Sequence, residues 1–300
     1  MRFDATPRVS FHRDGGDSLL IYDAKYNHLP TLIHGAQGLG AAPVSFSSNA
    51  RLAGHGSTLR GKRLGERDIF LPLRLDTGHM LASNNYRERI LRFLSPLDDR
   101  ELTLRLDVPG RDGWREIPVH YAGGLEGDYG GDYRGNTESI GLELKATEAL
   151  WRGEPVSISH QVSPATKPFL STTEPFFPVM LADSTIAGRI TVEVAGDAPT
   201  YPLWTITPPG EDLTIRHEES GSEFYLDGLL TENVMLDMSN GHLWSASDPD
   251  GDMLWERVPT DRGRMFSMKP GRNSIEFAMI GSTTDSMVHV TYAPRYLAGY

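Results

Sequence analysis

The sequence predicts a mainly β protein of two domains: an N-terminal β-rich domain with one packed α-helix, and a C-terminal β-sandwich. Its 300 residues exceed what one hydrophobic core usually serves. Its 31 glycines and 20 prolines favour many turns and therefore many short strands. Residues 194–210 form an extended run in which Pro199 and Pro202 exclude a helix. We place the first domain at residues 1–153 and the second at residues 154–300, with 154–188 as a proline-rich crossover.

The first block is expected to begin with a hairpin of two strands within residues 1–34, where short apolar runs lie between Gly15-Gly16 and Pro30. Residues 35–65 hold seven glycines, and we expect a long loop or edge-strand region there. Alternation of apolar and polar residues then predicts half-buried strands at 69–75, 102–108 and 140–146, with a return strand beginning at 119–121.

The one helix of the first domain is predicted over residues 83–97, with Ser83 or Asn84 as its N-cap. Five apolar residues share one face and should pack on a sheet: Tyr86, Ile90, Phe93, Leu94 and Leu97. The remainder carries Arg87, Arg89 and Arg92. These arginines form either a solvated basic face or a surface that meets an acidic neighbouring subunit. The candidate subunit-interface residues are therefore Tyr86, Arg87, Arg89 and Arg92.

The second block alternates short strands with Gly, Asp and Asn turns, which is typical of a sandwich. Further strands are plausible in the crossover at 156–158 and 177–181. Asn240-Gly241 and Asp250-Gly251 each predict a tight hairpin. The main strands are expected at residues 190–194, 203–207, 213–217, 223–227, 234–238, 242–246, 253–257, 264–268, 274–280 and 287–292.

Composition excludes several classes of function. The chain has no cysteine, which excludes disulfides, cysteine-ligated zinc and thiol catalysis. A net charge of −11 argues against a nucleic-acid partner, since an acidic surface repels phosphates. The residues after Met1 do not form the apolar core of a signal peptide, and no run is long enough to span a bilayer. We expect no membrane partner.

No motif points to catalysis. Residues 56–62 have the spacing of a phosphate loop, but Arg63 stands where Ser or Thr is needed and a strand is expected to follow. Asp248, Asp250 and Asp252 gather three carboxylates, yet the glycine and glutamate of an EF-hand are missing; a hairpin turn or a partial cation site remains. The histidines form no i, i+2 or i, i+4 pair, and no serine lies in a nucleophile elbow. We expect no enzyme and no cofactor.

Trp204, Trp244 and Trp255 are candidates for stacking on sugar rings, because flat apolar rings fit pyranose faces. The alternative is that they pack in the core and hairpins of the sandwich, as aromatic side chains usually do.

Eight stretches follow one another along nearly the whole chain: the glycine-rich segment; the strand at 67–75; the helix with Tyr86, Arg87, Ile90, Leu94 and Pro96; the strand at 140–146 running to Leu150-Trp151; and residues 194–210, 220–226, 268–275 and 290–296. In this order they resemble the distal tail proteins of siphophages, in particular the form carried by phages of actinobacteria. One departure is Ala195-Gly196-Asp197, where the family pattern suggests Asn before the Gly-Asp turn.

The resemblance implies a belt domain that assembles, typically as a hexameric ring, and a galectin-like or carbohydrate-module-like sandwich. Such a ring is a structural virion protein at the distal end of the tail, assembled in the host cytoplasm. It joins the tail tube protein to the tail-tip or baseplate proteins, with the tape measure protein as a further candidate partner, and DNA passes through its lumen. The alternatives are a host-surface carbohydrate-binding module carried by the sandwich and, ranked last, a glycan-cleaving enzyme.

Overall fold

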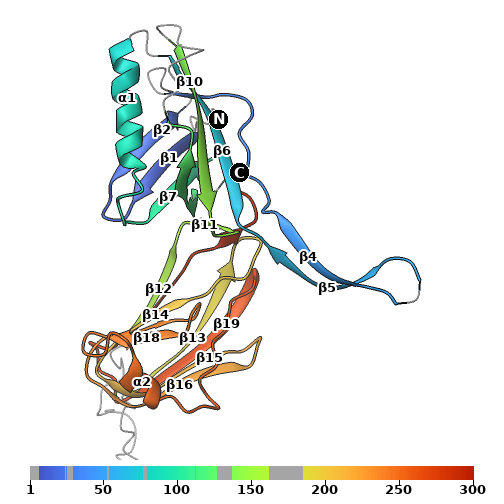
Figure 1. The fold of residues 1–300 in the computed structure, drawn as a ribbon. Helices are drawn as coiled ribbons and strands as arrows, with labels where there is room; N and C mark the ends of the chain where they lie inside the picture. The colour runs from blue at the N-terminus through green and yellow to red at the C-terminus, as the bar shows by residue number, and fades with distance from the viewer. Residues whose placement is uncertain are drawn as a thin grey trace, which may run out of the picture. The chain divides into compact units, whose positions relative to one another are not determined.

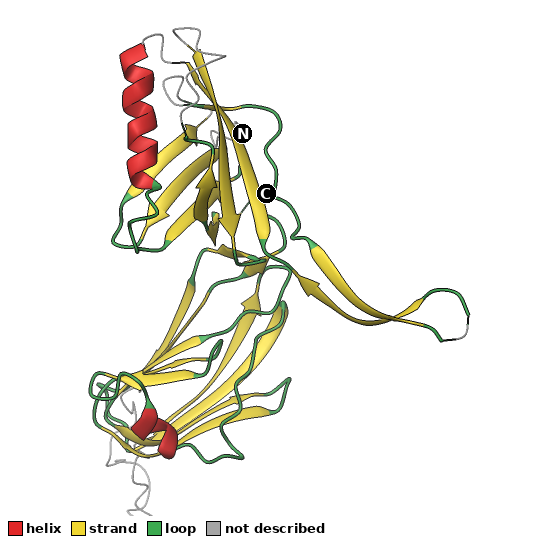
Figure 2. Cartoon of the chain, in the orientation of Figure 1, coloured by secondary structure: helices red, strands yellow, loops and turns green. Residues whose placement is uncertain are grey.

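The computed structural model describes residues 7–23, 25, 30–52, 54–76, 80–111, 113–126, 137–161 and 185–300. Contacts divide the chain into two compact units. Unit 1 comprises Met1–Glu154 and Arg295–Tyr300, and unit 2 comprises Pro155–Pro294. Both units are built mainly of strands (Figures 1 and 2), so the predicted mainly β fold is confirmed. The expectation that the second domain runs to residue 300 is wrong, because the last six residues belong to unit 1.

Unit 1 contains two antiparallel sheets that enclose one core, with Phe11, Leu71, Leu104 and Leu142 among its fully buried side chains. The predicted alternation is visible in β6, where every second residue from Arg67 to Leu75 is buried. The six-stranded sheet has the order β2 (Ser18–Asp23), β1 (Arg8–Arg13), β7 (Leu102–Asp107), β8 (Arg115–Pro118), β11 (Trp151–Gly153), β21 (Arg295–Tyr296). The four-stranded sheet has the order β3 (Thr31–Leu32), β6 (Arg67–Asp76), β10 (Thr137–Ala146), β9 (His120–Gly123).

The helix of unit 1, α1, spans Met80–Phe93. The predicted N-caps are wrong, since Ser83 and Asn84 lie inside the helix. Met, Leu and Ala at positions 80–82 are strong helix formers, and they outweigh the capping preference of serine and asparagine. The predicted apolar face is confirmed in part: Ile90 and Leu94 are buried in the core, whereas Leu97 lies beyond the helix and is exposed.

The C-terminal segment is held in unit 1 by backbone and side-chain contacts. β21 pairs with β11, the Arg115 guanidinium donates to the carbonyl of Ala298 at 2.6 Å, and the Gly299 N–H donates to the carbonyl of Leu39 at 2.8 Å. Arg67, at the start of β6, is 2% exposed and reaches the same segment through the carbonyl of Leu297. The chain therefore leaves unit 1, builds unit 2, and returns to complete the first sheet.

Gly299 lies where no side chain fits. A Cβ atom there would approach Leu106 Cδ1 to 2.7 Å and the Trp151 ring to 2.8 Å. We expect Gly299→Val to lower the free energy of unfolding by about 1–3 kcal/mol, since both neighbours are buried and cannot move freely. Chemical denaturation measures the loss. Gly61→Ala is the control, because a Cβ at Gly61 meets nothing within 4 Å; equal losses would contradict the packing argument.

Unit 2 is a sandwich of two antiparallel sheets around a second core, so the predicted β-sandwich is confirmed. Fully buried Trp204, Phe224 and Ile275 come from three of its strands. The five-stranded sheet has the order β12 (Val156–Gln161), β20 (Met287–Tyr292), β14 (Leu203–Thr207), β17 (Val234–Asp237), β18 (His242–Ser245). The four-stranded sheet has the order β13 (Thr185–Val194), β19 (Gly271–Ile280), β15 (Gly210–His217), β16 (Ser222–Leu230).

Two strands predicted for unit 2 are wrong. The segment expected as a strand at 253–257 is instead a short helix, α2 (Asp252–Glu256), preceded by Gly251 at φ 82°. The carboxylate of Asp248 accepts the backbone N–H of Leu254 at 2.9 Å and so stabilises the first turn of α2, which replaces the predicted hairpin at Asp250-Gly251. Residues 264–268 form no strand; of these five, only Met268 forms an isolated bridge, to Thr200. β17 and β18 do form a hairpin at Asn240-Gly241, but its loop spans the four residues 238–241 rather than the two residues that the sequence predicted. The strand expected at 177–181 lies outside the described residues.

Candidate subunit-contact surfaces

β4 (Val44–Ala50) and β5 (Ser57–Leu64) pair with each other in a two-stranded sheet of their own (Figure 1). We call these strands and the residues between them the ribbon. All of β4 and all of β5 except Leu64 are exposed. A two-stranded hairpin without a third strand or a packed face is marginally stable in water. The exposed strands of the ribbon therefore receive little stabilisation from a hydrophobic core.

The ribbon has one mainly apolar face, which also carries Lys62, and one polar face. The register pairs Val44 with Leu64, Phe46 with Lys62, and Ser48 with Leu59, and paired side chains lie on the same side. Phe46 is 66% exposed and Leu59 is 57% exposed, and Val44 is also exposed. The polar face consists of Ser45, Ser47, Asn49, Thr58, Gly61 and Arg63. An exposed strip of large apolar side chains on one face is typical of a protein-protein contact.

The ribbon is also cationic. Between residues 44 and 65 the chain has Arg51, Arg60, Lys62 and Arg63 but no aspartate or glutamate. The whole chain has a net charge of −11. The charge of the ribbon is thus opposite in sign to the net charge of the whole chain.

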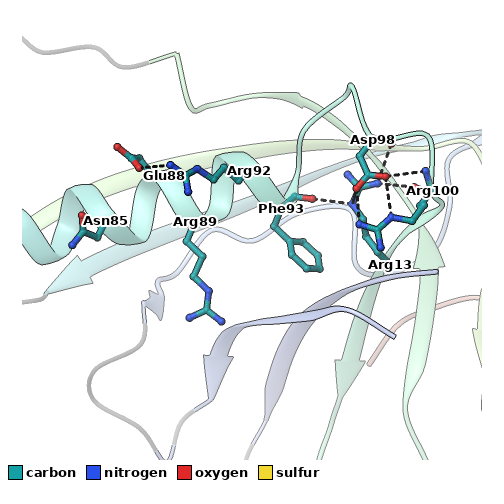
Figure 3. Close-up of a pocket in the computed structure, with 8 residues that line it drawn as sticks. All are labelled: Arg13, Asn85, Glu88, Arg89, Arg92, Phe93, Asp98 and Arg100. Carbon is teal, nitrogen blue, oxygen red and sulfur yellow. Dashed lines mark hydrogen bonds and ion pairs between the residues drawn. The ribbon is translucent and has the colours of Figure 1, made fainter. Parts of the chain in front are cut away.

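A second cationic surface lies beside α1. It is a hollow of about 470 Å³ lined by Arg13, Asn85, Glu88, Arg89, Arg92, Phe93, Asp98 and Arg100 (Figure 3). Arg92 is paired with Glu88 at 3.1 Å and Arg100 with Asp98 at 2.8 Å. Arg89 extends away from the Glu88–Arg92 pair, and within the described part of the chain it has no ion pair. Four arginines against two carboxylates leave the hollow positive.

The wall of this hollow is built around Arg13, whose side chain is 3% exposed. Its guanidinium donates to four backbone carbonyls, those of Phe93 and Ser95 at 3.0 Å, Asp98 at 3.1 Å and Arg100 at 2.6 Å. These carbonyls belong to the last residue of α1 and to the loop that follows it. Arg13 therefore satisfies acceptors that the end of a helix leaves unpaired, and it fixes the loop that carries Asp98.

The Asp98 carboxylate should make this wall sensitive to acid. Hydrogen bonds from Arg100 hold the pKa of Asp98 at about 2, below its usual value. Because the pKa of Asp98 is lower in the folded protein than in the unfolded chain, where it is about 4, the ionised carboxylate stabilises the fold. This stabilisation is present above about pH 4 and is lost as the pH falls toward 2. We expect Asp98→Asn to lower Tm at pH 7 and to have little effect near pH 2. Thermal unfolding at both pH values measures this, and an equal deficit at both would contradict it.

The four predicted interface residues have different surroundings. The Tyr86 hydroxyl donates to the carbonyl of Leu20 at 2.9 Å, and burial raises the pKa of Tyr86 to about 12. Tyr86 thus serves the fold of unit 1. Arg87 is half-buried, whereas Arg89 and Arg92 are exposed and line the hollow. Only Arg89 and Arg92 are placed to meet another subunit, and that role stays a prediction.

The three predicted sugar-stacking tryptophans do not share a surface. Trp204 is fully buried in the core of unit 2, so its assignment as a stacking platform is wrong: neither face of the ring reaches solvent. Trp255 is half-buried and packs edge-to-face with Phe224 at 6.2 Å. Trp244 is half-buried and stacked with His242 at 4.5 Å.

The carboxylates at residues 248–252 do not converge on one point, because Asp248 is buried and stabilises α2. Across the described residues, no three His, Asp or Glu side chains gather closely enough to hold a metal ion. Within the same residues, no helix is both long and apolar enough to cross a membrane.

Glycines made residues 35–65 resemble a loop or an edge-strand region open to partners, so sequence reasoning did not predict the paired strands of the ribbon or its apolar and cationic character. Two signals could have found it. One signal is strand periodicity: apolar residues alternate at Val44 and Phe46 in β4, and at Leu59 and Leu64 in β5 once Arg60 is counted as a bulge residue. The absence of acidic residues over the same stretch of an acidic chain is the other signal.

Comparison of the whole chain with solved structures gives the fold of phage tail hub and baseplate proteins. The chain is similar to the Dit protein (gp 19.1) of phage SPP1, described as a paradigm of the hub adsorption apparatus in phages that infect Gram-positive bacteria. That match has a TM-score of 0.58 and 11% identity and covers 96% of this chain and 98% of the other. Chains of the phage p2 baseplate in its activated conformation, with calcium and with strontium, match with TM-scores of 0.52, 10% identity and the same coverage.

No family model matches the sequence, and no curated protein matches it. The structural matches alone confirm the resemblance to distal tail proteins, at the level of the fold.

Proposed function

We propose that this chain is a structural adaptor at the distal end of a siphophage tail, where copies of it form a ring, expected to be a hexamer. The ring joins the tail tube protein to tail-tip or baseplate proteins, and the tape measure protein is a further candidate partner. The observation that carries the proposal is the ribbon, an exposed apolar and cationic arm on a fold shared over 96% of the chain with phage hub proteins. The role is one of assembly rather than catalysis.

The partner of the ribbon is a second copy of unit 1. Burying the apolar face would contribute roughly 1.5–3 kcal/mol for each large side chain that leaves water. The four cationic residues of the ribbon and the positive hollow beside α1 would each meet acidic groups of the neighbour. Galectin-like character of unit 2 and assembly in the host cytoplasm remain expectations from the resemblance.

Mass photometry of the purified full-length protein over a range of concentrations tests the proposal. We expect a species of several times 33.2 kDa that dominates at high protein concentration. Charge complementarity is weakened by salt. The oligomer should therefore begin to dissociate at a higher protein concentration in 1 M salt than in 0.1 M salt. A protein that stays a monomer at every concentration, alone and with a purified tail tube protein, would overturn the ring.

A further inference from the structure

The strand β12 (Val156–Gln161) is the outermost strand of the five-stranded sheet of unit 2 and lies at the margin of that sheet in Figure 1. One of its edges pairs with β20 in a regular register without a bulge. Within the described part of the chain, no backbone group bonds to its other edge. A row of free N–H and C=O groups on a sheet edge is a template for another strand.

The other three sheet edges of unit 2 are each protected against strand pairing. Along β16, the backbone N–H groups of Tyr225 and Asp227 donate to carbonyls of the segment 257–262, which covers that edge. β13 carries the charged side chains of Arg189 and Glu193. β18 has only four residues. Bound segments, charges and short strands are the usual means by which proteins prevent edge pairing.

β12 has none of these protections. Its six residues include no lysine, arginine, aspartate, glutamate or proline. Ile158 packs against the core of unit 2 but is only half-buried, and Val156, two residues before it on the same side of the strand, is 38% exposed. The inner side of this edge therefore leaves apolar surface in water, which a further strand would cover.

The polar side chains on the outer side of β12 already have partners within the sheet. The Ser159 hydroxyl is hydrogen-bonded to Nδ1 of His289 at 2.7 Å, and the Ser157 hydroxyl to that of Thr291 at 3.0 Å. Nε2 of His289 is in turn 3.1 Å from the Thr291 hydroxyl. A strand added beside β12 would leave these hydrogen bonds intact, so the pairing carries little desolvation cost from side chains.

We propose that β12 pairs antiparallel with β12 of a second copy, so that two five-stranded sheets become one continuous sheet. Two identical antiparallel strands are related by a two-fold axis, and each offers the other the same free edge. The chain has a net charge of −11, and β12 lets two copies meet without placing like charges opposite each other. Inner side chains face inner side chains only if the axis passes through a residue, Ile158 or Ser159.

This contact goes beyond the adaptor role and uses neither the ribbon nor α1. It is a weak contact, because two short strands add few hydrogen bonds that water does not already offer. The pair should therefore form at submillimolar protein concentration, and it should be absent at the nanomolar concentrations of mass photometry.

Disulfide trapping of the full-length protein tests the pairing, because the chain has no cysteine of its own. Directly opposed residues of antiparallel strands have Cβ atoms about 5 Å apart, close enough for a disulfide after a small adjustment. With the axis at Ser159, Ser159→Cys should link to itself under mild oxidation. With the axis at Ile158, Ser157→Cys should link to Ser159→Cys in a mixture in which one variant carries a tag. We expect one of these two samples to give a covalent dimer of twice 33.2 kDa.

Thr205→Cys is the matched control. Thr205 lies in the same cross-strand row as Ser159 and His289, two strands in from the edge, so it reports on contact through the face of the sheet. It should give no covalent dimer. The inference is overturned if both registers stay unlinked, as they would with any other strand on this edge, or if Thr205→Cys links equally well. The cross-link should persist in the Phe46→Asp background, so it fails independently of the ring.

Discussion

Phe46→Asp is expected to abolish self-association of the full-length protein. Phe46 is 66% exposed in the isolated chain and lies in the middle of the apolar face of the ribbon. In the assembly the aspartate would lose the aromatic contact and would place a carboxylate in an apolar interface, against acidic surface of the neighbour. We expect the dissociation constant to rise at least about 100-fold, since 2.8 kcal/mol corresponds to that factor. Mass photometry measures the shift toward monomer.

Ser47→Asp is the control for this variant. Ser47 is the next residue of β4 and points to the polar face, opposite Gly61. It adds the same charge at the same distance along the ribbon, so general repulsion affects both variants alike. Self-association close to that of the unaltered protein is expected for Ser47→Asp. If both variants associate normally, or if both fail equally, the apolar face is not the contact. The Tm of Phe46→Asp should not fall, because the side chain supports no core.

Arg67→Met is expected to cause the largest loss of stability. The guanidinium of Arg67 donates to the carbonyls of Gly38 at 2.9 Å, Gly40 at 2.6 Å, Ala149 and Leu297 at 3.4 Å. Burial lowers the pKa of Arg67, yet arginine stays charged at any working pH. Methionine fills similar volume but leaves the carbonyls without a donor, at about 1–3 kcal/mol for each that stays dry. We expect the free energy of unfolding to fall by about 3–5 kcal/mol.

Differential scanning calorimetry and urea unfolding measure this loss. Arg74→Met, on the same strand, is the control: its side chain is 51% exposed and its ion pair with Asp76 is 3.5 Å long. An exposed pair of this kind contributes at most about 1 kcal/mol. Arg67→Lys should rescue little, because one ammonium cannot reach four carbonyls on three segments. A loss for Arg67→Met no greater than that for Arg74→Met would contradict the role assigned to Arg67.

The strands of the protein were largely predictable because burial on one face imposes a period of two. β6, β7, β10 and most strands of unit 2 fall where alternation predicts them. The buried face of α1 was predictable for the same reason, from Ile90 and Leu94. The ends of the elements were harder to predict. The start of α1 and the existence of α2 depend on capping and on hydrogen bonds that compete with local preference.

The candidate surfaces were predictable only in part. Arg89 and Arg92 could be identified as a basic helix face, but the buried Arg13 that builds the wall beside them comes from a strand about 80 residues earlier. Trp204 and Trp244 look alike in the sequence, and only strand pairing decides that the first is buried. In unit 2, the cross-strand row of Arg189, Glu276, Arg216 and Glu223 requires the register of four strands, which no local pattern contains.

The sequence by itself determined a Cys-free, acidic, two-part β protein with one amphipathic helix, because composition and periodicity act within a few residues. Tertiary structure alone decided three features: the return of residues 295–300 to unit 1, the isolation of the ribbon, and the Arg67 contacts that join four segments. Each depends on pairing between residues far apart in the chain. Such pairing is chosen by the whole fold, since the chain must first pay the entropy of closing long loops.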